Sequence, residues 1–468
     1  MRRNACILSL LLTTLLGITT NTHAAGFALI EQSVSGMGNA FAGVAASAED
    51  ASTIFFNPAG LAYLPDNQLV VAAHAIRPSA EVSNNGTTGV LGTAINSSNG
   101  GDAGDWAFLP NFYYAKAVSD SVKLGIGVNA PFGLKTEYDN GWTGRYHALK
   151  SELKTININP TIAFKLNDNV SFGAGVSYQR IEAELTKAVD FGSICAARVG
   201  VGPCTAAGLT ATSDDGKSGF KGDDWSWGFN LGTIIQATPF TRVGLAYRSG
   251  IKHKLEGSAV ISGEEQFDAL LGVGVPLAAV NALKAAFPNS NVQAKADLPA
   301  TLSASVYHKA NDRLDLMADI TWTGWNSFDV LRVVRTSGAL SGNTVDVQPE
   351  YWKNTMRYSL GASYRYDDNL KLRAGLAYDE SPISPHWLTP RIPDGGRTWL
   401  AFGANYKLAP NSAIDVGYTH IFVRDVNIDT SAQAAEIAKL GGSSAAGILK
   451  GNYDSNVNML SIQFTHTF

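Results

Sequence analysis

Alternation of apolar and polar residues, repeated along most of the chain, constrains the fold more than any other feature. In the segment 370–378, Leu370 and Leu372 share one face, while Lys371 and Arg373 share the other. A period of two places successive side chains on opposite faces of a β-strand. A soluble sandwich and a membrane barrel both produce this pattern, so periodicity alone leaves both open. The same alternation recurs in the segments 400–408, 414–419 and 460–468.

The connections between these segments distinguish the two architectures. Short polar turns alternate strictly with long connections, and a sandwich has no reason to place every long loop at one end. An outer-membrane barrel has short turns at one rim and long loops at the other. The predicted strands also exceed the roughly 9–11 residues that cross a bilayer. The short turns lie at 119–120, 167–169, 238–239, 311–312, 367–369 and 410–411, and the long connections at 83–104, 139–147, 188–222, 262–295, 336–343, 382–396 and 430–452.

These six short and seven long connections delimit 14 strands. The fold class predicted for residues 66–468 is therefore all-β, a 14-stranded antiparallel transmembrane β-barrel with long extracellular loops. Within one long loop, residues 270–287 carry apolar side chains at helical spacing, which predicts an amphipathic helix there.

The chain begins with a predicted secretory signal peptide, residues 1–24. Arg2 and Arg3 form its positive region, residues 7–18 its apolar region, and Thr22-His23-Ala24 a small-residue cleavage site. The apolar run is too short to span a membrane as a helix. The chain is expected to be exported and to reside in the bacterial outer membrane as a multi-pass barrel.

Residues 25–65 follow the leader and are rich in Gly, Ala and Ser. A flexible tail and a phosphate-binding loop are the alternatives for this composition. Phe27 and Leu29 are too apolar for a solvated tail, and Gly36-Met37-Gly38 lacks the lysine and the preceding strand of a phosphate loop. Gly36, Gly38 and Gly43 allow backbone conformations that other residues avoid, which suits packing in a confined space. The segment is predicted to be a plug, or hatch, inside the barrel lumen.

Asn57-Pro58-Ala59 is predicted to anchor the exit of this hatch. Pro58 fixes the backbone and Asn57 can hydrogen-bond neighbouring main chain. An ordinary turn before the first strand is the alternative.

Two cysteines, Cys195 and Cys204, lie in a polar, glycine-rich loop of an exported chain. They are a disulfide candidate, because a metal site would need further ligands that the neighbourhood lacks. No metal and no cofactor are expected.

The formal net charge of −4 gives no basic footprint for nucleic acid. None of the histidines after the leader belongs to a recognisable catalytic signature, so no enzymatic activity is expected.

An ordered set of short motifs carries a resemblance to a known family. The chain after the leader begins AGFALIEQSVSGMGNAFAG and continues to Asn57-Pro58-Ala59. It resembles the FadL-type transporters, outer-membrane proteins for long-chain fatty acids and some aromatic hydrocarbons. The resemblance implies a 14-stranded barrel plugged by its N-terminus, with long loops that frame a first apolar binding groove. Further matching motifs are Pro131-Phe132-Gly133-Leu134, residues 225–230, Leu298-Pro299, residues 322–325, residues 366–369, residues 379–382 and Ile392-Pro393-Asp394.

The predicted third strand, residues 122–138, is interrupted by Pro131, Phe132 and Gly133. Proline within a central strand removes a ladder hydrogen bond, and unpaired backbone facing lipid is too costly to persist. An ordinary kink near the loop end is the alternative. The resemblance implies a lateral opening in the wall at this point.

Strand parity places Lys353 and Arg357 on the lumen face, with Lys353 nearer the long loops. The resemblance implies that Lys353 touches the head group of the ligand and that Lys187 supplies a second basic contact. The alternative is that these cations balance acidic residues in the lumen.

The function predicted from these features is uptake of hydrophobic molecules, foremost long-chain fatty acids. The cargo would be captured by the loops, held in the lumen, released by the hatch and passed out sideways through the third strand. A transporter of neutral or aromatic hydrocarbons, a general porin and a surface receptor are the alternatives. The expected partners are hydrophobic small molecules, outer-membrane lipid and lipopolysaccharide, with no nucleic acid, and the expected state is a monomer.

Overall fold

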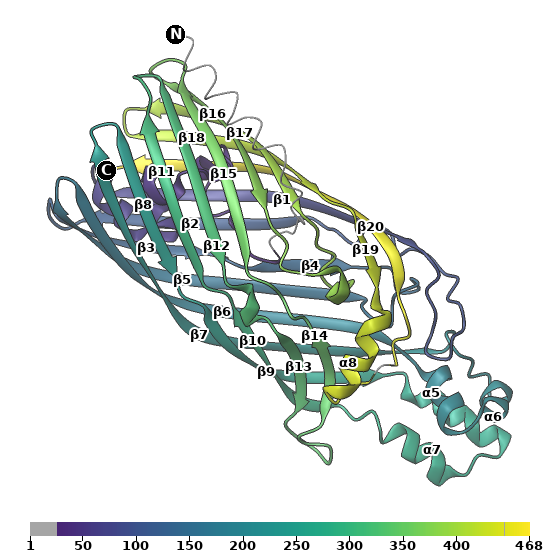
Figure 1. Ribbon diagram of the computed structural model, residues 1–468. Helices are drawn as coiled ribbons and strands as arrows, with labels where there is room; N and C mark the ends of the chain where they lie inside the picture. Colours follow the sequence, from purple (N-terminus) through teal and green to yellow (C-terminus); the bar gives the residue numbers. More distant parts are fainter. Residues whose placement is uncertain (1–25, 444) are drawn as a thin grey trace.

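The computed structural model describes residues 26–443 and 445–468, which form a closed antiparallel β-barrel (Figure 1). The predicted signal peptide lies outside the described residues. Twenty strand segments make up 14 barrel strands, because six barrel strands are each divided into two segments. The undivided strands are β1 (Gln68–Asn84), β2 (Ala107–Ala117), β5 (Lys150–Asn167), β6 (Val170–Asp190), β7 (Asp215–Thr238), β16 (Leu370–Asp379), β17 (Arg397–Ala409) and β20 (Lys450–Thr467).

The divided strands are β3 (Val122–Asn129) with β4 (Gly133–Glu137), β8 (Thr241–Arg248) with β9 (Ile251–Ser262), β10 (Ser290–Leu298) with β11 (Thr301–Lys309), β12 (Leu314–Thr323) with β13 (Val330–Arg335), β14 (Thr344–Pro349) with β15 (Thr355–Arg365), and β18 (Ser412–Val423) with β19 (Val426–Asp429). The barrel closes where β1 pairs with β20, from Gln68 opposite Thr467 to Asn84 opposite Gly451. The predicted fold class and strand number are confirmed.

The outer face of the barrel wall shows why the sequence alternates. Along β7, Leu231, Phe229 and Trp227 are exposed on the outside, where hydrocarbon is their solvent. Trp227 and Trp225 stack on Tyr178 of the adjacent β6, with ring centroids 4.3 and 4.5 Å apart. Charged residues replace aromatic ones beyond this point, so the three rings mark the edge of the apolar belt.

The two ends of the barrel differ as the connection lengths predict. The short turns and the C-terminus lie at one end, and helices α5 (Phe191–Arg198), α6 (Val201–Ala206) and α7 (Leu277–Lys284) lie at the other (Figure 1). The long loop predicted at 188–222 is shorter than expected, because β6 extends to Asp190 and β7 begins at Asp215. The part of the chain that the structure describes contains no helix long and apolar enough to cross a membrane.

The amphipathic helix predicted at 270–287 is two shorter elements. A 3₁₀ helix, η2 (Glu264–Val273), ends at Gly274, whose φ of +85° is left-handed, and α7 starts after Pro276. Phe267 and Phe287 from this region pack on Phe191 of α5, with ring centroids 5.0 and 5.2 Å away. Cys195 and Cys204 form a disulfide between α5 and α6 and belong to the same cluster.

The N-terminal segment, residues 26–64, lies within the barrel and contacts its wall on many sides. Val34 N–H donates to Gln463 of β20, Ala45 N–H to Ser305 of β11, and the Asn57 amide to the Thr233 carbonyl of β7. Its short helices are α2 (Val34–Met37), α3 (Val44–Ser47), α4 (Thr53–Phe56) and the 3₁₀ helix η1 (Pro58–Tyr63). The segment occupies the position expected of a hatch.

The backbone argument made for Gly36, Gly38 and Gly43 holds only at Gly43, whose φ of +74° is left-handed. Gly36 lies within α2 and Gly38 caps that helix with a φ of −58°, so neither uses a left-handed conformation. Gly38 instead permits a close approach, since a Cβ there would lie 3.0 Å from the Cα of Gly403 in β17. Left-handed backbone occurs further along the hatch, at Ala40 (φ 49°) and Phe41 (φ 58°).

Candidate functional site

A cavity, the larger of two described here, lies between the hatch and the barrel wall. Leu29, Ile30 and Phe55 of the hatch line it, as does Trp399 of β17. Pro131 and Phe132, at the interruption of the third barrel strand, line it as well.

The wall is incomplete next to this cavity. β3 pairs with β2 on one side and with β5 on the other, and ends at Asn129. β4, which continues the same barrel strand from Gly133, pairs with β5. Within residues 26–443 and 445–468 no ladder joins β4 to β2, so the first part of β2 has only β1 beside it.

The hatch supplies hydrogen bonds that the interrupted strand lacks. Leu29 N–H donates to the Pro131 carbonyl at 2.8 Å, and Gly133 N–H donates to the Phe27 carbonyl at 3.0 Å. The Gln32 amide donates to the Ala130 carbonyl at 2.9 Å. Buried backbone groups require hydrogen-bond partners. The start of the hatch supplies them at the kink, in the place of a neighbouring strand.

Thr155 of β5 completes the pairing of the interruption. Its hydroxyl donates to the Phe132 carbonyl at 2.7 Å and accepts from Phe132 N–H at 3.0 Å. The structure therefore brings together Pro131, Phe132, Gly133, Phe27 and Leu29, which sequence reasoning assigned to two separate features.

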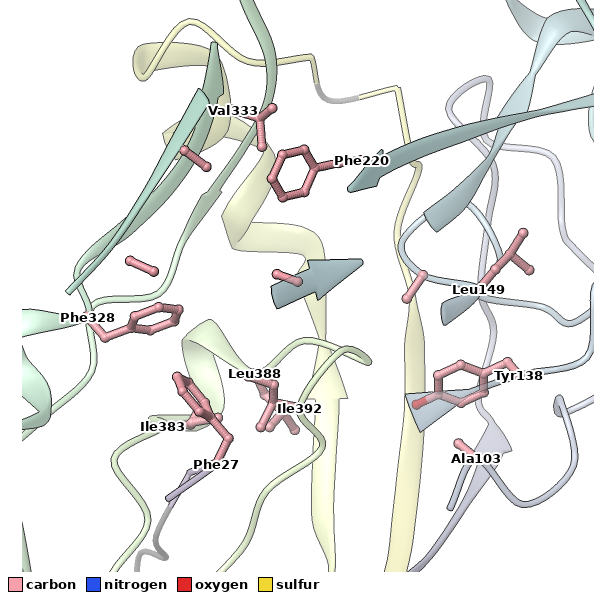
Figure 2. Close-up of a cluster of buried hydrophobic side chains, with 14 of the residues drawn as sticks. Phe27, Ala103, Tyr138, Leu149, Phe220, Phe328, Val333, Ile383, Leu388 and Ile392 are labelled. Carbon is pink, nitrogen blue, oxygen red and sulfur yellow. The ribbon is translucent and has the colours of Figure 1, made fainter. Parts of the chain in front are cut away.

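Phe27 fills an aromatic box at the loop-side end of the cavity. Its ring centroid lies 4.9 Å from Trp325, 5.4 Å from Phe328, 5.5 Å from Trp352 and 6.0 Å from Phe132. Figure 2 shows it beside Ile383 and Leu388 in the same buried cluster. The preceding residue is held by polar contacts, since Gly26 N–H donates to Asp394 and the Gly26 carbonyl accepts from Arg397, each at 3.0 Å.

A buried acid borders the aromatic box. The carboxylate of Glu350, in the connection between β14 and β15, accepts from Trp352 Nε1 at 2.9 Å. Burial raises the pKa of Glu350 to about 8, because the charged form loses its hydration.

Arg357 enters the same cavity from β15. It donates to Ser359 Oγ at 2.6 Å and to the Ala40 carbonyl of the hatch at 2.7 Å. Its guanidinium also lies 5.1 Å from the centre of the Trp399 ring. The parity argument placed this residue on the lumen face, and it lies there.

Lys353 lies elsewhere. β15 begins at Thr355, so the parity that governs Arg357 does not extend to Lys353, which is exposed in the preceding connection. Its backbone N–H bonds to the Pro382 carbonyl at 2.9 Å. The expectation that Lys353 faces the lumen beside Arg357 is corrected, because an irregular connection replaces the strand there.

Lys187 lines a second, smaller cavity nearer the long loops. Its ammonium donates to Asp346 at 2.9 Å, and Arg391 lines the same space. His147, also there, is buried, which lowers the pKa of its imidazole to about 3 and keeps it neutral at ordinary pH.

Asn57, Pro58 and Ala59 fix the far end of the hatch. The Asn57 carbonyl oxygen of the side chain accepts from Ala59 N–H at 3.1 Å, and its amide donates to the Ala45 carbonyl at 2.6 Å and the Thr233 carbonyl at 3.0 Å. Pro58 opens η1.

Arg248, the last residue of β8, also lines the larger cavity and was not anticipated. It donates to Ser177 Oγ at 3.1 Å and to the Phe55 carbonyl at 2.9 Å. The alternation within 241–248, where Leu245 and Tyr247 face outward, is a signal that could have placed it on the lumen face.

A closed barrel with an internal hatch, an apolar cavity and a gap in its wall defines a class, the outer-membrane transport barrels for hydrophobic molecules. The chain belongs to the outer membrane protein transport protein family (OMPP1/FadL/TodX), whose model matches residues 15–468. Members of this family are transport channels and not enzymes, and hydrophobic small molecules are their cargo.

Individual relatives agree with this assignment. An outer membrane protein of Neisseria meningitidis serogroup B is 33% identical over 458 residues, which is 96% of each chain. A long-chain fatty acid transport protein of Escherichia coli O6:H1 is 28% identical over 423 residues, covering 89% of this chain and 91% of its own. The crystal structure of a FadL homologue from Pseudomonas aeruginosa superimposes with a TM-score of 0.81 at 28% identity, covering 95% of this chain and all of its own.

Proposed function

We propose that this outer-membrane transporter carries long-chain fatty acids and releases them sideways through the wall. The observation that supports it best is the position of the larger cavity, which touches both the hatch and the interruption at Pro131 and Phe132. A molecule leaving this cavity between β2 and β4 would cross no hydrogen-bonded ladder.

Movement of the first hatch residues would control this exit. Phe27 and Leu29 occupy the backbone positions that seal the interruption, through the two hydrogen bonds to Pro131 and Gly133. Withdrawal of this short segment would open the gap while the remainder of the hatch stays in the lumen.

The long loops would collect the cargo first. The cluster of Phe191, Phe267 and Phe287 forms an apolar cap at the loop end, and the cavity that contains Lys187 lies on the loop side of the hatch. Lys187 and Lys353 would attract the carboxylate at this end, and Arg357 would act inside the larger cavity.

A neutral or aromatic hydrocarbon is a second candidate cargo. Aromatic side chains contribute much of the lining of the larger cavity, including Phe55, Phe56, Phe132 and Trp399. Such rings pack against apolar ligands whether or not these carry a head group.

Lipopolysaccharide and outer-membrane lipid would surround the barrel, which we propose is a monomer. Beyond the aromatic edge on β6 and β7 lies a mixed band of exposed charge that includes Lys154, Arg180, Lys221 and Lys254. Cationic side chains at this level suit the phosphate groups of lipid A.

Two measurements test the proposed cargo. Mass spectrometry of lipids that co-purify with the protein should find long-chain fatty acids, and cells that lack their own transporter should take up labelled hexadecanoate when they produce this chain. Uptake of toluene without uptake of hexadecanoate would favour the second candidate, and uptake of neither would overturn the proposal.

A further inference from the structure

We infer that Arg248 binds the carboxylate of the cargo inside the larger cavity and selects acids over neutral molecules of equal length. The inference rests on the proposed function, since it concerns how that cargo is recognised. Arg248 lies at the end of β8, half-buried, with its guanidinium directed at the cavity and the hatch.

Arg248 is a cation whose described neighbours include no anion. Its two hydrogen-bond acceptors, Ser177 Oγ and the Phe55 carbonyl, are neutral. Its register partners on both neighbouring strands, Asn230 of β7 and Thr301 of β11, are neutral as well. No ion pair involves Arg248 anywhere in residues 26–443 and 445–468.

Three other lumen arginines near the hatch have acidic residues beside them. Arg373 lies 2.5 Å from both Glu49 and Asp415, and Arg397 lies 2.8 Å from Asp394. Arg357, in the same cavity as Arg248, stands opposite Asp379 in the ladder between β15 and β16, and Asp379 lines the cavity too. A carboxylate that enters the cavity therefore meets an acidic neighbour beside Arg357, whereas the partners described for Arg248 are all neutral.

The geometry of the site suits a carboxylate. A guanidinium offers five N–H donors in a planar fork that can bind both oxygens of a carboxylate. Two acceptors engage part of this fork, and a charged group in an apolar site gains from an ionised partner. The Phe55 ring lies 4.3 Å from the guanidinium carbon and covers one of its faces, so a ligand would approach along the edge.

The same contact would connect the cargo to the hatch. Because Arg248 holds the carbonyl of Phe55, a carboxylate that takes over some of its N–H groups competes with the hatch for them. Binding of the acid at this position would loosen α4 from β8.

Binding to the purified protein tests the inference with two probes, hexadecanoate and hexadecan-1-ol, which share a chain and differ in charge. R248M should weaken binding of hexadecanoate at least tenfold and change binding of hexadecan-1-ol less than twofold. R248K should recover part of the affinity for the acid. R242M is the matched control, because Arg242 lies on the same strand and face but packs on the rings of Tyr63 and Tyr307 outside the cavity.

The binding results separate a role of Arg248 in acid recognition from a role in holding the hatch. Equal losses for both probes in R248M, with R248K behaving like R248M, would mean that Arg248 only supports the hatch and would overturn the inference. Unchanged binding of hexadecanoate by a folded R248M protein would overturn it as well. A wild-type protein that binds neither probe would overturn the proposed fatty-acid function itself, and the inference with it.

Discussion

The two parts of the hatch are held in different ways. Residues 26–32 reach the wall through a few backbone hydrogen bonds at the kink and through the aromatic box around Phe27. Residues 39–59 are fixed by side-chain amides, an ion-pair network and close backbone contact with the barrel. The first part borders the large cavity, and we propose that it leaves its site during transport, whereas the second part stays packed against the wall of the lumen.

Glycines on the lumen face of the wall make the second part fit. A Cβ on Gly232 would lie 1.9 Å from Asn57 Oδ1, and one on Gly375 would lie 2.1 Å from the carbonyl carbon of Asn39. On Gly244 it would lie 1.8 Å from the Ala45 carbonyl oxygen. These approaches let residues 39–59 touch the wall directly, which fits the proposal that they stay in place while residues 26–32, here called the latch, move.

The largest effect is expected from removing residues 25–43. This deletion takes away the first part, α2 and the first residues of the second part, which should turn a sealed barrel into a conducting pore in planar bilayers and abolish selective uptake. Deleting residues 26–32 alone should leave the seal largely in place, because residues 39–59 still fill the lumen. Equal conductance from the two deletions would contradict the division of the hatch into two parts.

The next largest effect is expected in the barrel wall at residues 131–133, which face the latch. Replacing Pro131-Phe132-Gly133 with Val-Thr-Val should extend the ladder toward β2 and abolish uptake, while the variant still folds, as judged by heat-modifiable migration on gels. Pro160 is the matched control, since it lies in β5 opposite Ile126 within a regular ladder, and Pro160→Val should leave uptake unchanged. Normal uptake by the triple variant would exclude a lateral exit at the kink.

The sequence predicts the barrel well and the cavity poorly, for a physical reason. Strand number, turn positions and the interruption at Pro131 follow from local patterns, because lipid outside and water inside impose alternation on each strand. The pairing of Phe27 and Leu29 with that interruption joins residues about 100 positions apart, and no local pattern encodes it. Lys353 was misplaced because parity holds only while the strand remains regular, and β15 begins two residues later.

The inward-facing positions of the strands carry two further signals about the lumen. The alternation that identified outward Leu245 and Tyr247 also fixes Arg248 as a lumen residue. The lumen-facing glycines carry a similar signal, since small residues recurring on the polar face of strands indicate a second backbone packed against them.

A moderate effect is expected from Asp415→Asn, which probes the fixed part. Arg373 and Asp415 have side chains that are 1% and 3% exposed, and breaking a buried pair leaves one charge uncompensated. Because Glu49 remains 2.5 Å from Arg373, the loss in the free energy of unfolding should be near the lower end of the usual range, about 3 kcal/mol. Urea unfolding in detergent measures it, and hydrogen exchange should increase in residues 39–59 more than in residues 26–32.

The exposed pair of Lys254 and Glu256 supplies the control for that measurement. Both side chains are more than half exposed, so Glu256→Gln should change stability by less than about 1 kcal/mol. A loss in Asp415→Asn no larger than this would mean that the network around Arg373 does not hold the hatch.

The smallest effect is expected at Lys353, outside both parts of the hatch. Its side chain is exposed and forms no ion pair within the described residues, so a carboxylate that it meets there remains largely hydrated. Exposed charge pairs contribute up to about 1 kcal/mol, so Lys353→Met should weaken hexadecanoate binding at most about fivefold and leave binding of hexadecan-1-ol unchanged. A tenfold or greater loss specific to the acid would place the head group at the rim, beside the connection between β14 and β15. That result would contradict the assignment of the head group to the interior cavity that the latch closes.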